Sequence, residues 1–582
     1  DRAAAAACRR EAMHHPSLVP VPPEELTEPE RTMRDPLVRT APSAAAVTLM
    51  HHHAAQVGHA PQDWVDTEGV GVDKNNGQPG CAGKRPVMKC CPMGKVHSRL
   101  MDQALPREEH PQQYGGLPQR SVREPVLILW SVVWRLAHSL KSFLVQLYDV
   151  RTAFPQMGWD ELFEEVNNSD TTNYAGKRME NTHRRMRVYM TTADGVICLR
   201  RKRGVREGAT DGPGLFTRGY AKPMREFERE LRAADTGQRI LLRYNEQTHD
   251  LSLGFFIDDV EHLSLIKSPE EARQWSNRCH ALLKRALKKF QLAIQPRKSE
   301  SLVRYCGKGS VKAMETSYGW HPPKYPAPVV GRLLSAVRYL GPYLSVHVDM
   351  NVEIRKRIVA ANMNFVDFAR VLKSSKTPQF GKKVLFSCLI TSALLSCMEA
   401  LAPEEHQVLQ LERAHLRLAR QCLGRYGYRR TGDEDSKDEE VTNRTVRAAL
   451  GLPLLKLLLR VRRLKFLRHL VRSGQDRVLA SLLGTATWDD ADTQMVDATG
   501  APTEHSPPWL RMVHVDATAI LPNWTGFRQE WKQTITNCTD ETLKDYIVSA
   551  QPVIRFPQAE EPEAEPYRCP DCTNTFLSLI HI

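Results

Sequence analysis

Two adjacent aspartates, Asp258 and Asp259, stand at the end of an apolar run that starts at Leu251. A run of this kind is typical of a buried strand. Two carboxylates about 4 Å apart repel each other by roughly 4 kcal/mol at an effective dielectric of about 20, so the pair is costly without a cation. Mg²⁺ prefers carboxylate oxygens together with substrate phosphates. Taken alone, the run fits a metal site and a solvent-facing turn equally well.

A second acid in the same setting favours the metal site. Residues 144–148 form another apolar run, and Asp149 follows it directly. Two strands that each bring carboxylates to one edge of a sheet predict a two-metal site. In such a site the ions, about 3.5–4 Å apart, hold the attacking and leaving oxygens of a phosphoryl transfer.

Five short motifs follow one another between residues 149 and 341. In the first, Ala153 and Phe154 follow Asp149 by four and five residues. The others are a glycine-rich stretch, the aspartate pair, a Leu-x-x-Gln-x-x-Lys-Ser-Glu block and an Arg-Tyr-Leu-Gly segment, at residues 203–216, 256–259, 292–300 and 338–341. This series resembles the reverse transcriptase family, and specifically the polymerase encoded by non-LTR retrotransposons.

The motifs also depart from the family's pattern. Residues 203–216 are similar to Arg-Gly-Val-Arg-Gln-Gly-x-x-x-Ser-Pro-x-Leu-Phe, but Glu207 replaces the usual Gln and Gly212 the usual Ser. Pro155 replaces an acid that is common after the phenylalanine. An acid at Glu207 is expected to weaken nucleotide or template binding. Gly208 is expected to let the template strand or the nascent base pair approach the backbone closely.

The resemblance implies roles for individual residues. Asp149, Asp258 and Asp259 would bind two Mg²⁺ ions. Phe154 would clash with a ribose 2′-hydroxyl and so favour deoxynucleotides, and its alternative is an ordinary core ring. Lys298 would assist pyrophosphate departure as a general acid, and its alternative is a surface lysine.

Basic residues further upstream resemble the family's fingers. Lys74 and Arg85 correspond to a region that approaches the incoming triphosphate or the template, with solvated hairpin charges as the alternative. Residues 113–116 with Arg120 resemble the next block of the fingers.

The resemblance implies an α+β fold, a right-hand polymerase whose fingers and palm contain an antiparallel palm sheet, followed by an all-helical thumb and extension. A segment free of acids between Glu440 and Asp476 carries nine lysines and arginines and is expected to bind a nucleic-acid duplex, with a membrane surface as the alternative. The predicted ranges are an N-terminal segment or linker over 1–69, fingers and palm over 70–325, the thumb over 326–430, the basic extension over 431–475, a linker over 476–566 and half of a zinc finger over 567–582.

The last of these ranges contains Cys569 and Cys572, whose Cys-x-x-Cys spacing suits Zn²⁺. The histidine half of such a finger does not follow, so Zn²⁺ is expected there only in a longer protein. The chain also starts at Asp1 without a methionine, and we expect it to be a fragment.

Composition agrees with a nucleic-acid partner. Lysine and arginine number 81 against 67 acids, a net charge of +14, which suits a phosphate backbone. The 13 cysteines are scattered, which indicates a reducing compartment rather than a disulfide framework. No apolar run approaches the roughly 18 residues of a membrane span, so no membrane partner is expected.

The resemblance therefore implies an RNA-directed DNA polymerase that adds dNTPs to a primer 3′-hydroxyl, with an RNA template and a DNA primer or target. It also implies a nuclear location with a cytoplasmic ribonucleoprotein stage. Two alternatives stay open: a catalytically dead remnant that only binds nucleic acid, and a related maturase or RNA-dependent RNA polymerase. The intact aspartates favour activity, and Phe154 argues against ribonucleotides.

Overall fold

The central sheet has five strands in the order β12-β11-β4-β10-β9. Strand β4 (Phe143–Tyr148) lies in the middle, antiparallel to β10 (Asp259–Leu265) on one side and to β11 (Glu300–Arg304) on the other. The outer strands are β9 (Leu253–Phe256), antiparallel to β10, and β12 (Arg332–Leu333), parallel to β11. All residues of β4 except the partly exposed Leu147 are buried, as expected of a strand covered on both faces.

This computed structural model describes residues 18–20, 60–73, 84–106, 110–170, 174–192, 195–318, 329–424, 442–488, 493–528 and 530–550. Lys74, Cys569 and Cys572 lie outside the described residues. The chain forms two units, which we describe separately. Unit 1 comprises residues 1–356, 395–407 and 462–538, and unit 2 comprises 357–394, 408–461 and 539–582.

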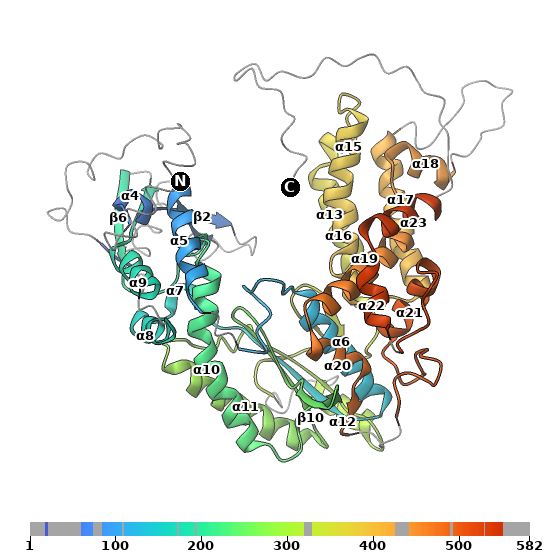
Figure 1. Cartoon of the computed structure of the whole chain (residues 1–582), viewed down its shortest axis with the longest axis horizontal. Helices are drawn as coiled ribbons and strands as arrows, with labels where there is room; N and C mark the ends of the chain where they lie inside the picture. Colours follow the sequence, from blue (N-terminus) through green and yellow to red (C-terminus); the bar gives the residue numbers. More distant parts are fainter. Residues whose placement is uncertain are drawn as a thin grey trace. The chain divides into compact units, whose positions relative to one another are not determined.

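Two long helices of unit 1, α10 (Gly212–Ala234) and α11 (Pro269–Lys288), lie along one face of the central sheet (Figure 1). Helix α11 starts at a capping box, in which the Ser268 hydroxyl accepts a hydrogen bond from the Glu271 backbone N–H. Its residues Ala272, Cys279 and Ala286 recur every seven positions and are buried in the core beneath the sheet.

A second sheet of unit 1 has the order β1-β6-β5-β2-β3. All of its pairs are antiparallel except β2 with β5. Its strands are β1 (Leu18–Pro20), β2 (Thr67–Asp73), β3 (Lys84–Cys90), β5 (Arg187–Thr192) and β6 (Gly195–Arg201). The other helices of unit 1 up to residue 318 are α4 (Gln62–Val65), α5 (Pro92–Ala104), α6 (Arg123–His138), α7 (Ala153–Gln156), α8 (Trp159–Ser169), α9 (Ala175–Arg185) and α12 (Ser310–Tyr318).

Smaller sheets complete unit 1. Strands β13 (Ala336–Arg338) and β14 (Tyr343–Ser345) form a hairpin, and β7 (Leu241–Tyr244) pairs with both β8 (Gln247–Asp250) and β15 (Thr485–Ala486). An α+β fold with a mainly antiparallel central sheet, followed by helices, confirms the predicted fold class.

Within the described residues, all secondary structure after β14 is helical except β15 and the isolated Val496–Pro502 bridge. The elements from residue 351 to residue 472 are α13 (Asn351–Asp367), α14 (Ala369–Leu372), α15 (Gln379–Phe386), η3 (Ser387–Thr391), α16 (Ser392–Leu395), η4 (Met398–Ala400), α17 (Glu405–Leu423), α18 (Asn443–Leu450) and α19 (Leu455–Arg472). One helical stretch of the described chain, Gln379–Ala400, is long and apolar enough to cross a membrane by length and composition. Half of its apolar window is buried, as in the core helix of a soluble protein, so this is weak evidence for a membrane span.

The prediction of a linker over 476–566 is wrong for the described residues of that range. Helices occupy much of that range: α20 (Asp476–Leu483), α21 (Pro508–Ile520), α22 (Trp531–Asn537) and α23 (Asp540–Ala550). Helix α20 packs against α6 and β7, and the Trp509 indole of α21 donates to the Glu399 carbonyl at 2.7 Å. These helices are short and obtain their stability from tertiary packing, which the local sequence pattern does not report. The domain boundaries themselves stay predictions.

The basic residues of α19 in unit 1 have partners within the protein. Arg463 donates through Nε to the Asp516 carboxylate at 2.6 Å, and both side chains are buried. Arg468 and Arg472 donate to the carbonyls of Cys538 and Thr536. These arginines hold the helices that follow them. Binding of this segment to a nucleic-acid duplex stays a prediction.

We predict that Asp516→Ala lowers the free energy of unfolding by about 3–5 kcal/mol, because it leaves the Arg463 guanidinium buried without its carboxylate. Urea unfolding followed by circular dichroism measures the change. The control is Glu270→Ala, which removes an exposed ion pair with Arg273 and should shift the midpoint little. If Asp516→Ala had the same unfolding midpoint as the control, the Arg463–Asp516 pair would not stabilise the fold, and the packing of residues 508–520 as a helix of unit 1 would be contradicted.

Candidate active site

The central sheet brings Asp149 and the aspartate pair together. Strands β4 and β10 pair with Tyr148 opposite Val260, so the next position on each strand is Asp149 and Asp259. Both aspartates line one cavity of about 450 Å³. Asp258 lies in the turn between β9 and β10, immediately before Asp259. The three acids that the sequence singled out therefore share one end of the sheet.

The acids influence one another electrostatically. Asp259 keeps an exposed face. Partial loss of water around its carboxyl, followed by the charges of Asp258 and Asp149, nevertheless raises its pKa to about 7. Among the described residues, no three His, Cys, Asp or Glu side chains are grouped tightly enough to count as a formed metal site. A set made only of repelling carboxylates fits a hard cation such as Mg²⁺, because the cation removes the repulsion and carboxylate oxygens are its preferred ligands.

The block at 292–300 packs directly against Asp149. The Gln295 N–H donates to the Asp149 carbonyl at 2.8 Å, and the Asp149 N–H donates to the Ser299 hydroxyl at 3.4 Å. Lys298 lines the same cavity as the acids. Burial raises the pKa of Asp149, and the positive charge of Lys298 partly opposes that rise. The structure thus places Lys298 beside Asp149.

The cavity wall also contains Arg332, which sequence reasoning missed, beside Glu300 and Arg338 from two of the predicted motifs. Arg332 forms an ion pair with Glu300, and both line the cavity. The Arg338 N–H donates to the same Glu300 carboxylate at 3.3 Å. Arg332 reaches this wall only because β12 pairs in parallel with β11. A single arginine in a short strand carries no local signal of that pairing.

Phe154 does not line that cavity. Its ring is partly exposed and stacks on Phe216 of α10, with centroids 4.6 Å apart and planes 9° apart. Its carbonyl accepts from the Val205 N–H at 2.7 Å, which ties the first motif to the glycine-rich stretch. One face of the ring is therefore fixed by packing, while selection of deoxynucleotides by Phe154 stays a prediction.

A buried ion pair shapes the glycine-rich stretch. Arg206 Nη2 lies 2.9 Å from the Asp211 carboxylate, and both side chains are almost fully buried. Burial alone would raise the pKa of Asp211, but the charges of Arg206 and His183 and the hydrogen bond from Arg206 together outweigh burial, so the pKa is lowered. The two residues close this stretch into a loop that leads into α10.

Gly208 meets another part of the protein. Its φ is +98°, and a Cβ there would lie 2.6 Å from the Met88 carbonyl oxygen of β3. The Met88 N–H donates to the Glu207 carbonyl at 2.8 Å. The close approach of β3 thus leaves no space for a side chain at Gly208. The close approach of a template strand to Gly208 stays a prediction.

Glu207 has an internal electrostatic role. Burial lowers the pKa of Arg201 to about 10, and the charge of Glu207 opposes that fall. Glu207 is therefore close enough to a buried guanidinium to stabilise it. Arg85 lies in β3 opposite Val72. The nucleotide or template contacts expected of Glu207, Arg85 and Lys74 stay predictions.

Comparison with known proteins defines the class. The family model for reverse transcriptase (RNA-dependent DNA polymerase) matches residues 72–342. The chain therefore contains a reverse transcriptase domain, and the acids, Lys298 and the hairpin at 336–345 lie within or at the end of it. A search of curated proteins gave no match.

Solved telomerase structures are similar to the chain. Apo telomerase from Candida tropicalis has 10% identity and a TM-score of 0.38, covering 91% of this chain and 73% of that chain. Telomerase from Candida albicans, in complex with a TWJ fragment of telomeric RNA, has 8% identity and a TM-score of 0.33, covering 73% and 69%. A form of the Candida tropicalis enzyme truncated from its C-terminal domain has 10% identity and a TM-score of 0.31, covering 49% and 54%. The chain thus spans about half of that last structure.

We predict that Gly208→Ala destabilises the protein more than Gly237→Ala. Both glycines have a φ near +100°, but a Cβ at Gly237 would meet nothing within 4 Å. An alanine in this backbone region costs about 1–3 kcal/mol at either site, and only at Gly208 does the new methyl also overlap a carbonyl. Thermal unfolding of the two variants measures the difference. Equal losses would show that β3 can move away from the loop.

Proposed function

We propose that this chain is the RNA-directed DNA polymerase of a non-LTR retrotransposon, and that it extends a primer 3′-hydroxyl with dNTPs on an RNA template. The observation that carries the proposal is the cavity where Asp149 and Asp259 meet Lys298, inside the matched reverse transcriptase domain. The order and spacing of the five motifs support the retrotransposon assignment.

In this mechanism Asp149, Asp258 and Asp259 hold two Mg²⁺ ions. When bound, such ions lower the pKa of the attacking hydroxyl and stabilise charge on the departing pyrophosphate. Lys298, on the cavity wall, donates a proton to that leaving group. Arg332 and Arg338 add positive charge to the same wall, which suits the phosphates of a primer or nucleotide.

The partners follow from the same proposal. An RNA template, a DNA primer or target and dNTPs all carry phosphates, and the net charge of +14 favours them. A nuclear location with a cytoplasmic ribonucleoprotein stage belongs to the retrotransposon assignment. Zn²⁺ at Cys569 and Cys572 belongs to it only for a longer protein.

We predict that the chain extends oligo(dT) on poly(rA) with Mg²⁺ and dTTP, and that Asp258→Ala lowers the rate at least about a hundredfold, because it removes a metal ligand. Chelation of Mg²⁺ should abolish extension by the parent. The control is Glu246→Ala, an exposed acid in the turn between β7 and β8. An inactive parent that still binds RNA in a salt-sensitive way would instead support the dead remnant, and Glu207→Gln would be the next variant.

We predict that Phe154→Val lowers discrimination against ribonucleotides by about 10–200-fold, because the smaller side chain leaves room for a 2′-hydroxyl. Competing dTTP and UTP incorporation on the same template measures the ratio. Phe368→Val, at a partly exposed phenylalanine of unit 2, is the matched control. Unchanged discrimination with intact dTTP incorporation would assign Phe154 to the core.

A further inference from the structure

The turn that carries Asp258 and Asp259 has a demanding backbone. Ile257, immediately before the pair, has a φ of +59°. A β-branched side chain rarely adopts this left-handed region, so surrounding contacts must hold it there. The direction of both carboxylates depends on this residue, because the chain reverses at it between β9 and β10.

The side chain of Gln113 supplies those contacts. Its Oε1 accepts from the Ile257 N–H at 2.8 Å, and its Nε2 donates to the Ile257 carbonyl at 3.2 Å. The same Oε1 accepts from the Gly115 N–H at 2.9 Å. Gln113 is buried, with 3% of its surface exposed. A carboxamide carries an acceptor oxygen and a donor NH2 group, and here each of them bonds to the backbone of Ile257.

The segment around Gln113 lies along the outer strand β9. The Phe255 N–H donates to the Gln112 carbonyl at 2.9 Å, and the Tyr114 N–H donates to the Phe255 carbonyl at 2.8 Å. A Cβ at Gly115 would lie 2.5 Å from the Ile257 nitrogen, so the segment touches the turn with no space for a side chain. These contacts place Gln113 directly against the turn.

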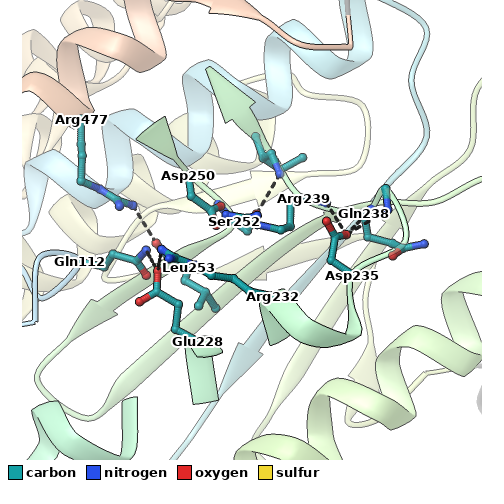
Figure 2. Close-up of polar contacts among 12 residues, drawn as sticks. Gln112, Glu228, Arg232, Asp235, Gln238, Arg239, Asp250, Ser252, Leu253 and Arg477 are labelled. Atoms are coloured by element: carbon teal, nitrogen blue, oxygen red, sulfur yellow. Dashed lines mark hydrogen bonds and ion pairs between the residues drawn. The ribbon is translucent and has the colours of Figure 1, made fainter. Parts of the chain in front are cut away.

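Residues from two helices hold this segment and strand in place (Figure 2). Glu228 of α10 accepts from Gln112 Nε2 at 2.9 Å. Arg477 of α20 donates to the Leu253 carbonyl at 3.1 Å. Arg477 also donates to the Tyr114 hydroxyl at 3.3 Å. The segment that carries Gln113 is therefore held in place by neighbouring side chains, as is required of a residue that positions another residue.

We propose that Gln113 is a positioning residue for the metal-binding aspartates: it fixes the backbone of Ile257 and thereby the direction of Asp258 and Asp259. The inference rests on the proposed polymerase function, since it concerns the same aspartates. Gln113 touches no reacting atom, so its effect must pass through the turn.

The test compares Gln113→Met with the parent and with Gln238→Met. Methionine keeps the side-chain volume and removes both hydrogen bonds to Ile257. Gln238 is also a buried glutamine, but its side chain bonds to Thr236 and Glu271. Three quantities are measured with a primer and template bound: the rate of single-nucleotide extension against Mg²⁺ concentration, Mn²⁺ binding by electron paramagnetic resonance, and the dissociation constant of the primer–template.

For Gln113→Met we expect the maximal rate to fall about tenfold or more, because small errors in the position of catalytic groups are costly. The Mg²⁺ concentration for half-maximal rate and the Mn²⁺ dissociation constant should both rise several-fold, while the primer–template dissociation constant stays within about twofold. Gln238→Met should match the parent in all three quantities. If Gln113→Met does not fold, Gly115→Ala is the second variant. Its new methyl group would press on the Ile257 nitrogen and displace the same turn, so the same changes in rate and metal affinity are expected.

A folded Gln113→Met variant with the parent's Mg²⁺ dependence and Mn²⁺ affinity would overturn the inference. So would equal losses in Gln113→Met and Gln238→Met, since they would reflect a general loss of stability. A parent that binds Mn²⁺ without extending primers would contradict the proposed function alone, and the comparison of Mn²⁺ affinities would still decide the role of Gln113.

Discussion

The pairing of β4 with β10 is the constraint on which the site depends. Its register sets Tyr148 opposite Val260 and so delivers Asp149 and Asp259 to the same end of the sheet. Because side chains alternate between faces along a strand, a slip of one residue would turn the aspartates to different sides. Such a slip is unfavourable because it would move the buried side chains of β4 to the opposite face and disrupt their packing. The register of β4 and β10 thus determines both the packing of the core and the positions of the aspartates.

Charge repulsion is the cost of that arrangement. Burial and the negative charges of Asp258 and Asp149 raise the pKa of Asp259 to about 7 when no cation is bound. The protein stabilises the site by backbone contacts that do not neutralise the acids. The block at 292–300 holds the main chain of Asp149, and Gln113 holds the turn before Asp258. The carboxylate oxygens can therefore remain available to a metal ion and a substrate.

Several positive charges that suggest nucleic-acid contacts are also used to build the protein. Arg206 is buried against Asp211, and Arg463 against Asp516. If either aspartate were removed, its arginine would remain as an uncompensated buried charge. The loop before α10 therefore depends on the Arg206–Asp211 pair, and helix α21 depends on the Arg463–Asp516 pair. A count of cations along the chain therefore overstates the positive surface that can meet a phosphate backbone.

The sequence by itself identified Asp149, Asp258 and Asp259 as candidates, since an apolar run that ends in an acid is a local pattern with a local cause. The order of the motifs, through its resemblance to a known family, added Lys298 and the fold class. The structure brings these four residues to one end of the sheet. Tertiary structure alone decided the positions of Arg332 and Glu300, the contact of Gln113 with Ile257 and the folding of residues 476–550. These depend on strand pairing and on contacts between segments far apart in the chain: Gln113 and Ile257 are separated by 144 positions. No local spacing reports such contacts, because their free energy arises only when the distant segments pack together.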